Sequence, residues 1–357
     1  MYPALSVLQA IGNQAEAVLW VGGQLGMEAE LIRRQGIPYA EIPAAGVHGV
    51  GLARLPGNLL KLAQGVAASR RILADFKPDV LFFTGGFVAA PMAVAGGRIP
   101  SVLYVPDIEP GLALRFLARS ASKIAVSAET SSAYFKKPEK VIVTGYPIRA
   151  GLTRWTRAES LKHFGFSADK PVLLVFGGSK GARSINRAVL QILPRLLDKY
   201  QVLHVSGSLD WAEVDAASHA LNPAQSAAYR AFPYLHEDMG AAFACSDLVV
   251  CRAGASSLGE LPAFGLPAIL VPYPYAWRYQ KVNADYLVSH QAAVLLKDED
   301  LGTHLHGTIV DLLADAEKLD AMKQAMRSLA RPQAAAEIAR IILAAGGQPL
   351  EKGADPS

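Results

Sequence analysis

Residues 249 to 280 read VVCRAGASSLGELPAFGLPAILVPYPYAWRYQ, and this stretch decides how the second half of the chain folds. The apolar run 247–251 is short enough for a buried strand, and small residues follow it before a helical pattern begins. Such a helix presents free N–H groups at the carboxyl end of a sheet, where small side chains let a phosphate approach. Glu260 lies about one turn into the helix, where a carboxylate can accept two ribose hydroxyls. The stretch therefore predicts a nucleotide-sugar site, with an ordinary βαβ crossover as the alternative.

Length and composition favour two well-buried domains. The chain has 357 residues, which is longer than a domain with a single core usually is. Hydrophobic residues make up 51% of the chain, as in a well-buried globular protein. The net charge of +4 is too small to argue for a nucleic-acid partner, although it allows a locally basic face toward an anionic membrane. Cys245 and Cys251 lie in or beside one apolar segment, which favours core thiols in a reduced, cytoplasmic protein over a disulfide or metal site.

Hydropathy gives no sign of a membrane-spanning or secreted chain. No uninterrupted apolar run reaches the roughly 18 residues that a transmembrane helix needs, so none is expected. The first residues lead directly into a helical pattern without the basic and apolar regions of a signal peptide.

Apolar strands alternate with helical segments along the whole chain. Strands are expected at residues 17–21, 39–42, 80–83, 101–105, 123–126, 140–144, 171–176, 201–205, 229–232, 248–251, 268–271 and 293–296. Continuous apolar runs are typical of parallel strands that are covered on both faces. We therefore expect two Rossmann-like, doubly wound α/β domains over residues 1–150 and 151–330, joined by a linker within 145–156. Residues 331–357 are expected to form a helix that packs back towards the N-terminal domain, followed by a tail.

Two glycine-rich turns follow strands in this pattern. Gly177-Gly178-Ser-Lys-Gly181-Ala opens a helix, and the hydroxyl of Ser179 could reach a phosphate oxygen. The turn matches neither the P-loop nor the G-x-G-x-x-G pattern, which disfavours a dinucleotide dehydrogenase. Gly85-Gly86 forms the equivalent turn in the first domain. Either turn, taken alone, is also explained by turn geometry without a ligand.

Five motifs together resemble the MurG family: TGGFVAAP at 84–91, GYPIR at 145–149, GGSKGARSIN at 177–186, PYLHEDM at 233–239 and CRAGASSLGE at 251–260. The resemblance covers essentially the whole chain in order. It implies the GT-B fold and an inverting transferase of peptidoglycan synthesis that uses neither a metal nor a cofactor. The implied reaction moves N-acetylglucosamine (GlcNAc) from UDP-GlcNAc to undecaprenyl-diphosphate-MurNAc-pentapeptide (lipid I), giving lipid II.

The resemblance also assigns candidate substrate-binding residues. It implies that Arg149 and Ser179 contact the diphosphate or the sugar nucleotide near it, and that the backbone of His236 meets the uracil. Glu260 would bind the ribose hydroxyls. The segment that surrounds the α-phosphate and ribose would consist of Ala255, Ser256, Ser257, Leu258 and Gly259. Tyr279 and Gln280 would face the hydroxyls of the GlcNAc. A departing UDP builds negative charge, which N–H groups, a helix dipole and arginine can stabilise without a metal.

The chain departs from the family pattern at its start. Family members begin with a strand and a glycine-rich loop carrying a histidine, and this loop ends one residue before the position of Tyr2-Pro3. That strand lies in the middle of a doubly wound sheet, so we expect unpaired ladders and an exposed apolar seam without it. We also expect the upstream coding sequence to continue in frame with this strand and loop.

Asp107 is the candidate catalytic base. Tyr104-Val-Pro-Asp107 stands where the family has His-Glu-Gln-Asn, and the carboxylate of Asp107 could accept a proton from the acceptor hydroxyl. A structural carboxylate or a helix cap is the alternative. Lys180 and Tyr279 also differ from the residues that are common in the family at these positions.

The segment 54–71 combines leucines with basic residues on one expected helix. Basic side chains attract anionic lipids and leucines enter the interface, which suits an acceptor with a lipid tail. The family resemblance implies that this region lies against the cytoplasmic leaflet and that the protein attaches peripherally to the cytoplasmic face of the cell membrane. A domain-core helix with a solvated basic face is the alternative. Other proteins of cell-wall synthesis and division are possible further partners.

Two other classes of function remain open from the sequence. Another GT-B enzyme, such as a lipid glycosyltransferase or a UDP-GlcNAc 2-epimerase, would use the same donor. A non-enzyme would bind the UDP-sugar without transferring it.

Overall fold

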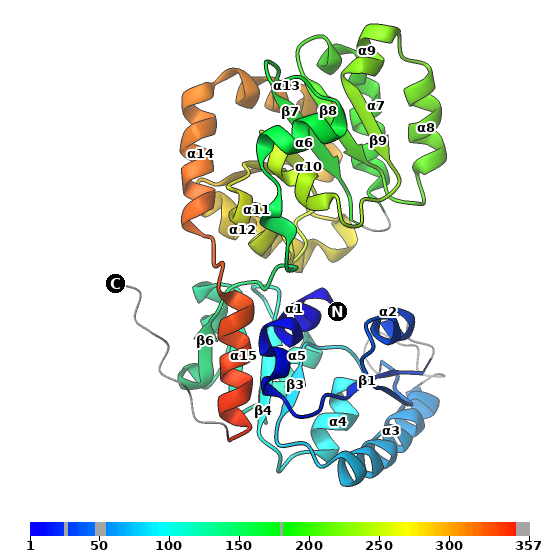
Figure 1. The fold of residues 1–357 in the computed structure, drawn as a ribbon, viewed down its shortest axis with the longest axis vertical. Helices are drawn as coiled ribbons and strands as arrows, with labels where there is room; N and C mark the ends of the chain where they lie inside the picture. Colours follow the sequence, from blue (N-terminus) through cyan, green and yellow to red (C-terminus); the bar gives the residue numbers. More distant parts are fainter. Residues whose placement is uncertain (25–27, 47–54, 179–180, 348–357) are drawn as a thin grey trace. The chain divides into compact units, whose positions relative to one another are not determined.

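The computed structural model describes residues 1–24, 28–46, 55–178 and 181–347. It divides into two compact units, one formed by Met1–Pro147 with the stretch from Gln333 onward, and the other by Ile148–Pro332. Figure 1 shows the chain coloured along its sequence, with many of its helices and strands labelled. Both units are layered α/β structures with parallel sheets, as the alternation of apolar strands and helical segments predicted.

The second unit is built on a six-stranded parallel sheet in the order β12-β11-β10-β7-β8-β9. Its strands are β7 (Val172–Phe176), β8 (Gln201–Val205), β9 (Tyr229–Phe232), β10 (Leu248–Cys251), β11 (Ala268–Leu270) and β12 (Ala293–Leu295). Its α-helices are α6 (Arg157–Phe164), α7 (Arg183–Leu197), α8 (Trp211–His219), α9 (Pro223–Ala227), α10 (Met239–Cys245), α11 (Ser257–Phe264), α12 (Trp277–Ser289), α13 (Leu301–Ala314) and α14 (Ala316–Ser328). Short 3₁₀ turns are η5 (Leu152–Arg154), η6 (Pro274–Ala276) and η7 (Asp298–Asp300).

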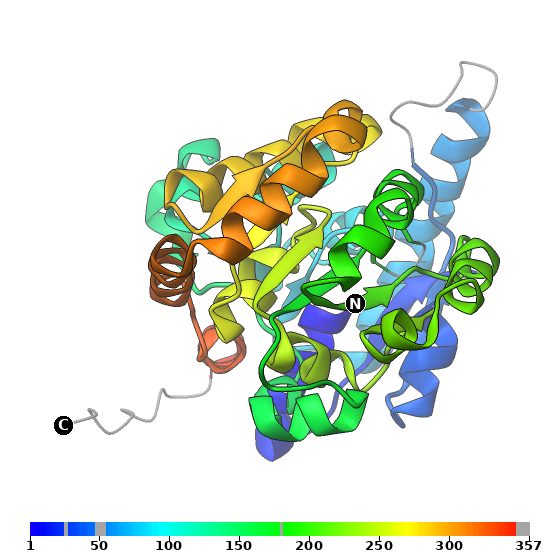
Figure 2. The ribbon, with the colours of Figure 1, turned by 90° about the horizontal axis from the view of Figure 1, so that it is seen from above.

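Helices cover both faces of this sheet, which explains why its strands are apolar runs. Leu173 and Val250 belong to a core that includes Ile185 of α7 and Leu305 of α13. On the other face Phe176 of β7 makes an edge contact with Phe243 of α10 at 5.7 Å between ring centroids. Figures 1 and 2 show these helical layers from two directions. A strand buried on both faces has no solvent side on which polar residues could alternate.

The first unit contains two separate parallel sheets, with orders β1-β2 and β3-β4-β5-β6. Its strands are β1 (Trp20–Gly23), β2 (Tyr39–Ile42), β3 (Leu81–Phe83), β4 (Ser101–Val105), β5 (Lys123–Val126) and β6 (Val141–Val143). Its α-helices are α1 (Tyr2–Ile11), α2 (Glu28–Arg34), α3 (Leu55–Phe76), α4 (Ala89–Ala95), α5 (Leu112–Leu117) and α15 (Ala334–Ala345). Short 3₁₀ turns are η1 (Gly12–Gln14), η3 (Glu129–Tyr134) and η4 (Pro138–Lys140).

Side chains of β4 point alternately into two cores. Leu103 and Val105 belong to a cluster that contains residues of α4 and α5. Val102 and Tyr104 belong to a second cluster, which contains residues of α1 and α15. The C-terminal helix α15 therefore packs beside the N-terminal helix α1 within the first unit, as Figure 1 shows. The predicted tail over residues 348–357 lies outside the described residues.

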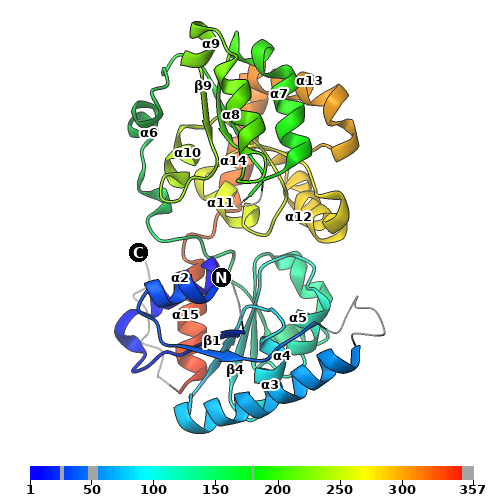
Figure 3. The same ribbon diagram turned by 90° about the vertical axis from the view of Figure 1, so that its right-hand side faces the viewer.

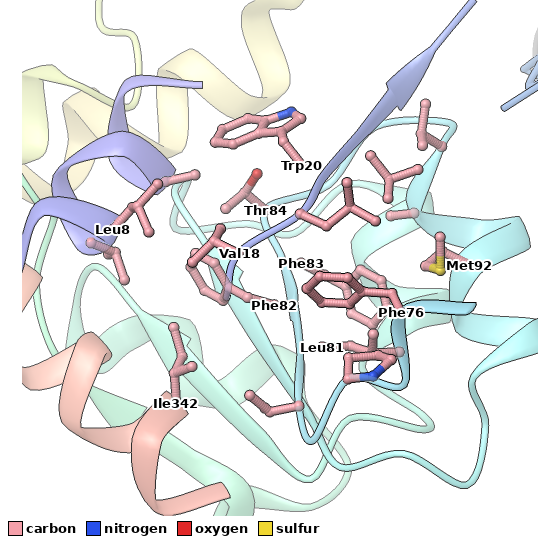
Figure 4. Close-up of a pocket in the computed structure, with 18 of the residues that line it drawn as sticks. Leu8, Val18, Trp20, Phe76, Leu81, Phe82, Phe83, Thr84, Met92 and Ile342 are labelled. Atoms are coloured by element: carbon pink, nitrogen blue, oxygen red, sulfur yellow. The ribbon is translucent and has the colours of Figure 1, made fainter. Parts of the chain in front are cut away.

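An apolar cavity of about 470 Å³ lies between β1 and β3, where the sequence predicted a gap in the first sheet. Trp20 and Val21 line it from β1, and Leu81 and Phe83 line it from β3. Figure 4 shows Trp20, Leu81 and Phe83 together with other side chains around the same space, namely Leu8, Phe76, Met92 and Ile342. Among the described residues no strand pairs with β1 on its cavity side or with β3 on the side away from β4.

The break in the first sheet predicts uneven protection of backbone amides. The N–H groups of Trp20 and Gln24 donate to carbonyls beside β2, so the alternate groups of Val21 and Gly23 point towards the cavity edge. Leu103 and Tyr104 lie in a strand that is paired on both sides. Hydrogen exchange measured by NMR is expected to be more than about a hundredfold faster at Val21 and Gly23 than at Leu103 and Tyr104. Equal protection would show that the edge of β1 is covered.

Candidate functional site

Neighbouring strands bring two turns to one edge of the second sheet. Cys251 at the end of β10 pairs with Phe176 at the end of β7. Gly177 follows β7 and leads to α7, whereas Arg252 follows β10 and leads to α11. Since the strands are parallel, both helices begin at the carboxyl edge of the sheet, where ligands of such folds bind.

A cavity of about 640 Å³ lies between these turns, within the second unit. Six of the predicted site residues line it: Gly177, Gly178, Gly181, Ser256, Ser257 and Gln280. Its walls also contain residues that the sequence did not single out, among them Arg183, Ser184, Asp210, Arg252, Tyr273 and Asp298. Ser179 and Lys180, which complete the predicted turn, lie outside the described residues.

The backbone of the first turn requires glycine. Gly178 and Gly181 have φ values of 81° and 84°, a region that other residues rarely adopt. A Cβ atom on Gly181 would lie 2.2 Å from the carbonyl oxygen of Ser206, and one on Gly177 would lie 2.3 Å from the backbone nitrogen of Ala182. Gly181 is therefore packed directly against the residue that follows β8, and Gly177 against the start of α7.

Hydrogen bonds within the second turn decide which donors remain for a ligand. The N–H groups of Leu258 and Gly259 donate to the carbonyls of Ala255 and Ser256, and the hydroxyl of Ser257 donates to the carbonyl of Gly254. The predicted contact of Leu258 and Gly259 with a phosphate therefore cannot use these N–H groups while the turn keeps this conformation. The N–H groups of Ala255 and Ser256 precede the helix and are the candidate donors.

Glu260, Arg149 and His236 form a second group beside the turn. Burial raises the pKa of Glu260, while the nearby Arg149 and a hydrogen bond from Ser256 act in the opposite direction. Arg149 donates from Nη1 to the carbonyl oxygen of His236 at 3.1 Å. Ser256 links this group to the cavity, because it lines the cavity and bonds to Glu260. The structure thus brings together the residues predicted for the ribose, the uracil and the nearby phosphate.

Gln280 and Tyr279 lie at the beginning of α12. The side-chain oxygen of Gln280 accepts a hydrogen bond of 2.8 Å from the backbone N–H of Tyr273, which fixes the orientation of the amide at the cavity wall. Tyr279 is 36% exposed and is not among the residues that line the cavity. Of this pair, Gln280 is therefore the one that the geometry places at the cavity.

Arg252 connects several elements of the cavity wall, a role that the sequence did not predict. Its side chain is 12% exposed and forms an ion pair with Asp298. It donates to the carbonyl of Val271 at 3.1 Å and to the hydroxyl of Ser184 at 2.8 Å, and it lies over the ring of Tyr273. These bonds join α7, the end of β11 and η7. The position of Arg252 at the end of an apolar strand was the signal that could have identified it.

The remaining predicted residues lie in the first unit. Asp107 follows β4 and is half-buried. Two residues further along its loop, the buried Glu109 forms an ion pair with Arg115 at 2.8 Å. Gly85 and Gly86 have φ values of 103° and 89° and line the apolar cavity between β1 and β3. The structure thus places these glycines beside apolar side chains.

Replacing Glu260 by glutamine tests the effect of its burial. The folded state favours the protonated carboxyl, so the stability that this group contributes is present below its unfolded pKa of about 4.3 and is lost as the pH rises through the higher folded value. We expect Glu260→Gln to melt at a higher temperature than the unchanged protein at mildly alkaline pH, with the difference closing towards about pH 4. Thermal unfolding followed by circular dichroism measures this, and a less stable variant at alkaline pH would contradict it.

Comparisons with known proteins agree with this geometry. The N-terminal domain of glycosyltransferase family 28 matches residues 1–126, and the C-terminal domain of the same family matches residues 172–338. The chain is 39% identical over 366 residues to the UDP-N-acetylglucosamine--N-acetylmuramyl-(pentapeptide) pyrophosphoryl-undecaprenol N-acetylglucosamine transferase of Roseiflexus sp. (strain RS-1), covering 91% of this chain and 83% of the relative. It is 36% identical to the protein of the same name from Halothermothrix orenii, covering 94% and 92% of the two chains.

Solved structures show the same fold. The crystal structure of Acinetobacter baumannii MurG matches with a TM-score of 0.73 at 24% identity, covering 96% of this chain and 95% of that one. UDP-GlcNAc 2-epimerase from Neisseria meningitidis matches with a TM-score of 0.67 at 12% identity, covering 96% of both chains. Together with the family matches over both halves, these findings confirm the GT-B fold. The chain belongs to glycosyltransferase family 28 and is a hexosyltransferase.

Proposed function

We propose that this protein transfers GlcNAc from UDP-GlcNAc to undecaprenyl-diphosphate-MurNAc-pentapeptide, forming lipid II for peptidoglycan synthesis. The relatives that cover nearly the whole chain carry the name of this transferase. The observation that carries the proposal is the cavity at the carboxyl edge of the second sheet, where two helix-opening turns meet. A site of this kind suits the diphosphate of a sugar nucleotide.

The donor would lie across the two groups of residues in the second unit. Its diphosphate would meet the turn at Gly177 and Gly178 and the N–H groups of Ala255 and Ser256. Glu260 would accept the ribose hydroxyls, and it lies beside Arg149 and Ser256 in the same group of residues. Gln280 would reach a hydroxyl of the GlcNAc. As the bond to the sugar breaks, the N–H groups and the helix dipoles would stabilise the charge that grows on UDP.

The acceptor would be activated from the first unit. An inverting transfer needs a single base that removes the proton of the attacking hydroxyl, and Asp107 is the carboxylate that the sequence singles out. The loop of Asp107 is held at both ends. The hydroxyl of Ser127 donates to the carbonyl of Pro106 at 2.8 Å, and Nε of Arg115 donates to the carbonyl of Pro110 at 3.0 Å. A carboxylate on such a loop has a defined position, as a general base requires.

A membrane-facing patch would bring the lipid-linked acceptor to the enzyme. The first unit exposes apolar side chains on and beside α3, α4 and α5, namely Leu59, Leu60, Phe87, Leu112 and Phe116. Helix α4 packs against both α3 and α5, and Figure 3 shows the three helices side by side. Lys61, Arg70 and Arg71 are exposed on α3. Apolar side chains beside basic ones bind an anionic interface, so we propose peripheral attachment to the cytoplasmic face of the cell membrane.

Within the described ranges, no helix is long and apolar enough to cross a bilayer. Contacts with other proteins of cell-wall synthesis and division would follow from attachment at the same membrane, and they stay a prediction.

A transfer assay tests the proposed reaction. The protein is incubated with UDP-GlcNAc and a soluble lipid I analogue, and formation of the disaccharide product and of UDP is measured. We expect the product only when both substrates are present. Glu260→Gln is expected to raise KM for UDP-GlcNAc by roughly tenfold, because it removes a charge-assisted acceptor for the ribose hydroxyls. Glu317→Gln, a change of the same kind at an exposed position in α14, should leave KM unchanged.

Two outcomes of this assay would contradict the proposal. Release of UDP and epimerised sugar without the acceptor would indicate a 2-epimerase, the enzyme class of one structural relative. Binding of UDP without any product would indicate a UDP-sugar binder.

Vesicle flotation tests the membrane patch. Each basic side chain near an anionic surface contributes about 1 kcal/mol, so reversing Lys61, Arg70 and Arg71 to glutamate should reduce binding to phosphatidylglycerol vesicles by more than about tenfold. The matched control reverses three exposed basic residues of the second unit, Lys199, Lys318 and Arg331, and changes the net charge equally. Equal flotation of the two variants would remove the patch as the membrane contact.

A further inference from the structure

A chain of buried polar side chains crosses the core of the second unit and ends at the cavity. His204 of β8 is fully buried, with Nδ1 at 2.8 Å from the hydroxyl of Tyr229 and Nε2 at 3.0 Å from Oδ1 of Asn186. Nδ2 of Asn186 lies 2.8 Å from the carbonyl oxygen of Ser206 and 2.9 Å from Oδ2 of Asp210. The other carboxylate oxygen of Asp210 accepts a bond of 2.8 Å from Nε of Arg183.

The partners of these groups determine the direction of every hydrogen bond. Both neighbours of Nδ2 of Asn186 are acceptors, so the amide nitrogen faces them and Oδ1 faces His204. His204 must then donate from Nε2, which leaves Nδ1 to accept from the hydroxyl of Tyr229. Burial lowers the pKa of His204 to about 4, so the imidazole is neutral and has one donor and one acceptor, as this chain requires.

The outer end of the chain supports the glycine turn and its arginine. Ser206, whose carbonyl is held by Asn186, is the residue against which Gly181 packs, with 2.2 Å between that carbonyl oxygen and an ideal Cβ on Gly181. Arg183 begins α7 directly after this turn and lines the cavity. Its side chain remains 62% exposed although Asp210 holds its Nε. Within the described part of the chain no side chain or carbonyl bonds to the Nη groups of Arg183, so they are available at the cavity while Asp210 holds the Nε atom.

Arg183 differs in this respect from the other arginine of the cavity wall. Arg252 is nearly buried. Its guanidinium bonds to two backbone carbonyls, to the carboxylate of Asp298 and to the hydroxyl of Ser184. Of the described residues that line the cavity, Arg183 is thus the exposed cation next to the glycine turn. A guanidinium with free Nη groups matches the oxygens of a phosphate.

We infer that Arg183 binds the diphosphate of the sugar nucleotide and that Asn186 and His204 are positioning residues. These two residues hold Asp210 and the Gly181 turn in place, so that Arg183 meets the diphosphate. The inference rests on the proposed function of the same cavity. It adds a cationic contact to the donor site and gives a role to a buried polar network that packing alone does not require. Buried polar groups of this kind are costly unless every partner is satisfied.

The side chains of Tyr229, His204, Asn186 and Asp210, which lead to Arg183, are called the relay below. A double-mutant cycle on UDP affinity tests it. Arg183→Gln removes the charge and should weaken UDP binding by roughly tenfold. Asn186→Asp removes the amide donor and places a carboxylate against two acceptors, so it should weaken binding to a similar extent while kcat changes much less than KM. If Asn186 acts through Arg183, the double variant binds UDP no more weakly than Arg183→Gln alone. Isothermal titration with UDP gives the affinities, and thermal unfolding in the absence of UDP reports stability.

Two further variants separate positioning from general stability. Ser160→Ala removes a buried hydroxyl that bonds to the carbonyl of Thr156, so it should lower the melting temperature and leave UDP affinity unchanged. Tyr229→Phe removes only the donor at the far end of the relay, and it is expected to weaken UDP binding by about twofold to threefold even if Asn186→Asp does not fold.

The outcomes distinguish the relay from the donor site itself. Additive losses in the double variant, or full UDP affinity in Tyr229→Phe and Asn186→Asp, would overturn the relay. Absence of UDP binding by the unchanged protein would overturn the proposed donor site, whatever the variants do.

Discussion

The register between β7 and β10 is the constraint on which the candidate site depends. Pairing of Cys251 with Phe176 makes the two strands end at the same level. The turns that follow them therefore open side by side at the same cavity, and each leads to a helix. A shift of one strand by a residue would turn its side chains to the opposite face and separate the turns. The burial of both strands on both faces prevents such a shift.

Polar contacts over long sequence separations complete this arrangement. Arg252 reaches Ser184 and Asp298, so a single guanidinium ties the second turn to the start of α7 and to η7. Asn186 and His204 connect the same helix to β8 beneath the first turn. Each of these side chains is largely buried, and removing one partner would leave another polar group without its bond in the core. These bonds hold α7, β8 and η7 together beside the place where the diphosphate is proposed to bind.

Much of the fold was predictable from the sequence because the strands are short apolar runs bounded by turn residues. The apolar pattern places β4, β5, β8, β9 and β10 correctly, and the family resemblance is confirmed by the matches over both halves. The glycine and serine turns were recognisable because their backbone requires small residues. Ser256 and Ser257 belong to one of these turns, whereas Gln280 was assigned through the family resemblance, and all three line the cavity.

The sequence could not reveal contacts that arise only when distant elements pack. Asp298 lies 46 residues from Arg252, and no local pattern marks them as a pair. The same holds for Asn186 and His204, which read as an ordinary helix residue and an ordinary core histidine. The bonding of the N–H groups of Leu258 and Gly259 within the turn is likewise visible only in its geometry, and the contact of these two residues with the nucleotide stays a prediction.

The central claim is that the second unit binds the diphosphate of a UDP-sugar between its two turns. A crystal structure of the protein with UDP tests it most directly. The account predicts that the two phosphates lie between the Gly177–Gly178 turn and the backbone of Ala255 and Ser256, with the Nη groups of Arg183 at hydrogen-bonding distance. Phosphates bound at another place on the protein, with this cavity empty, would contradict it.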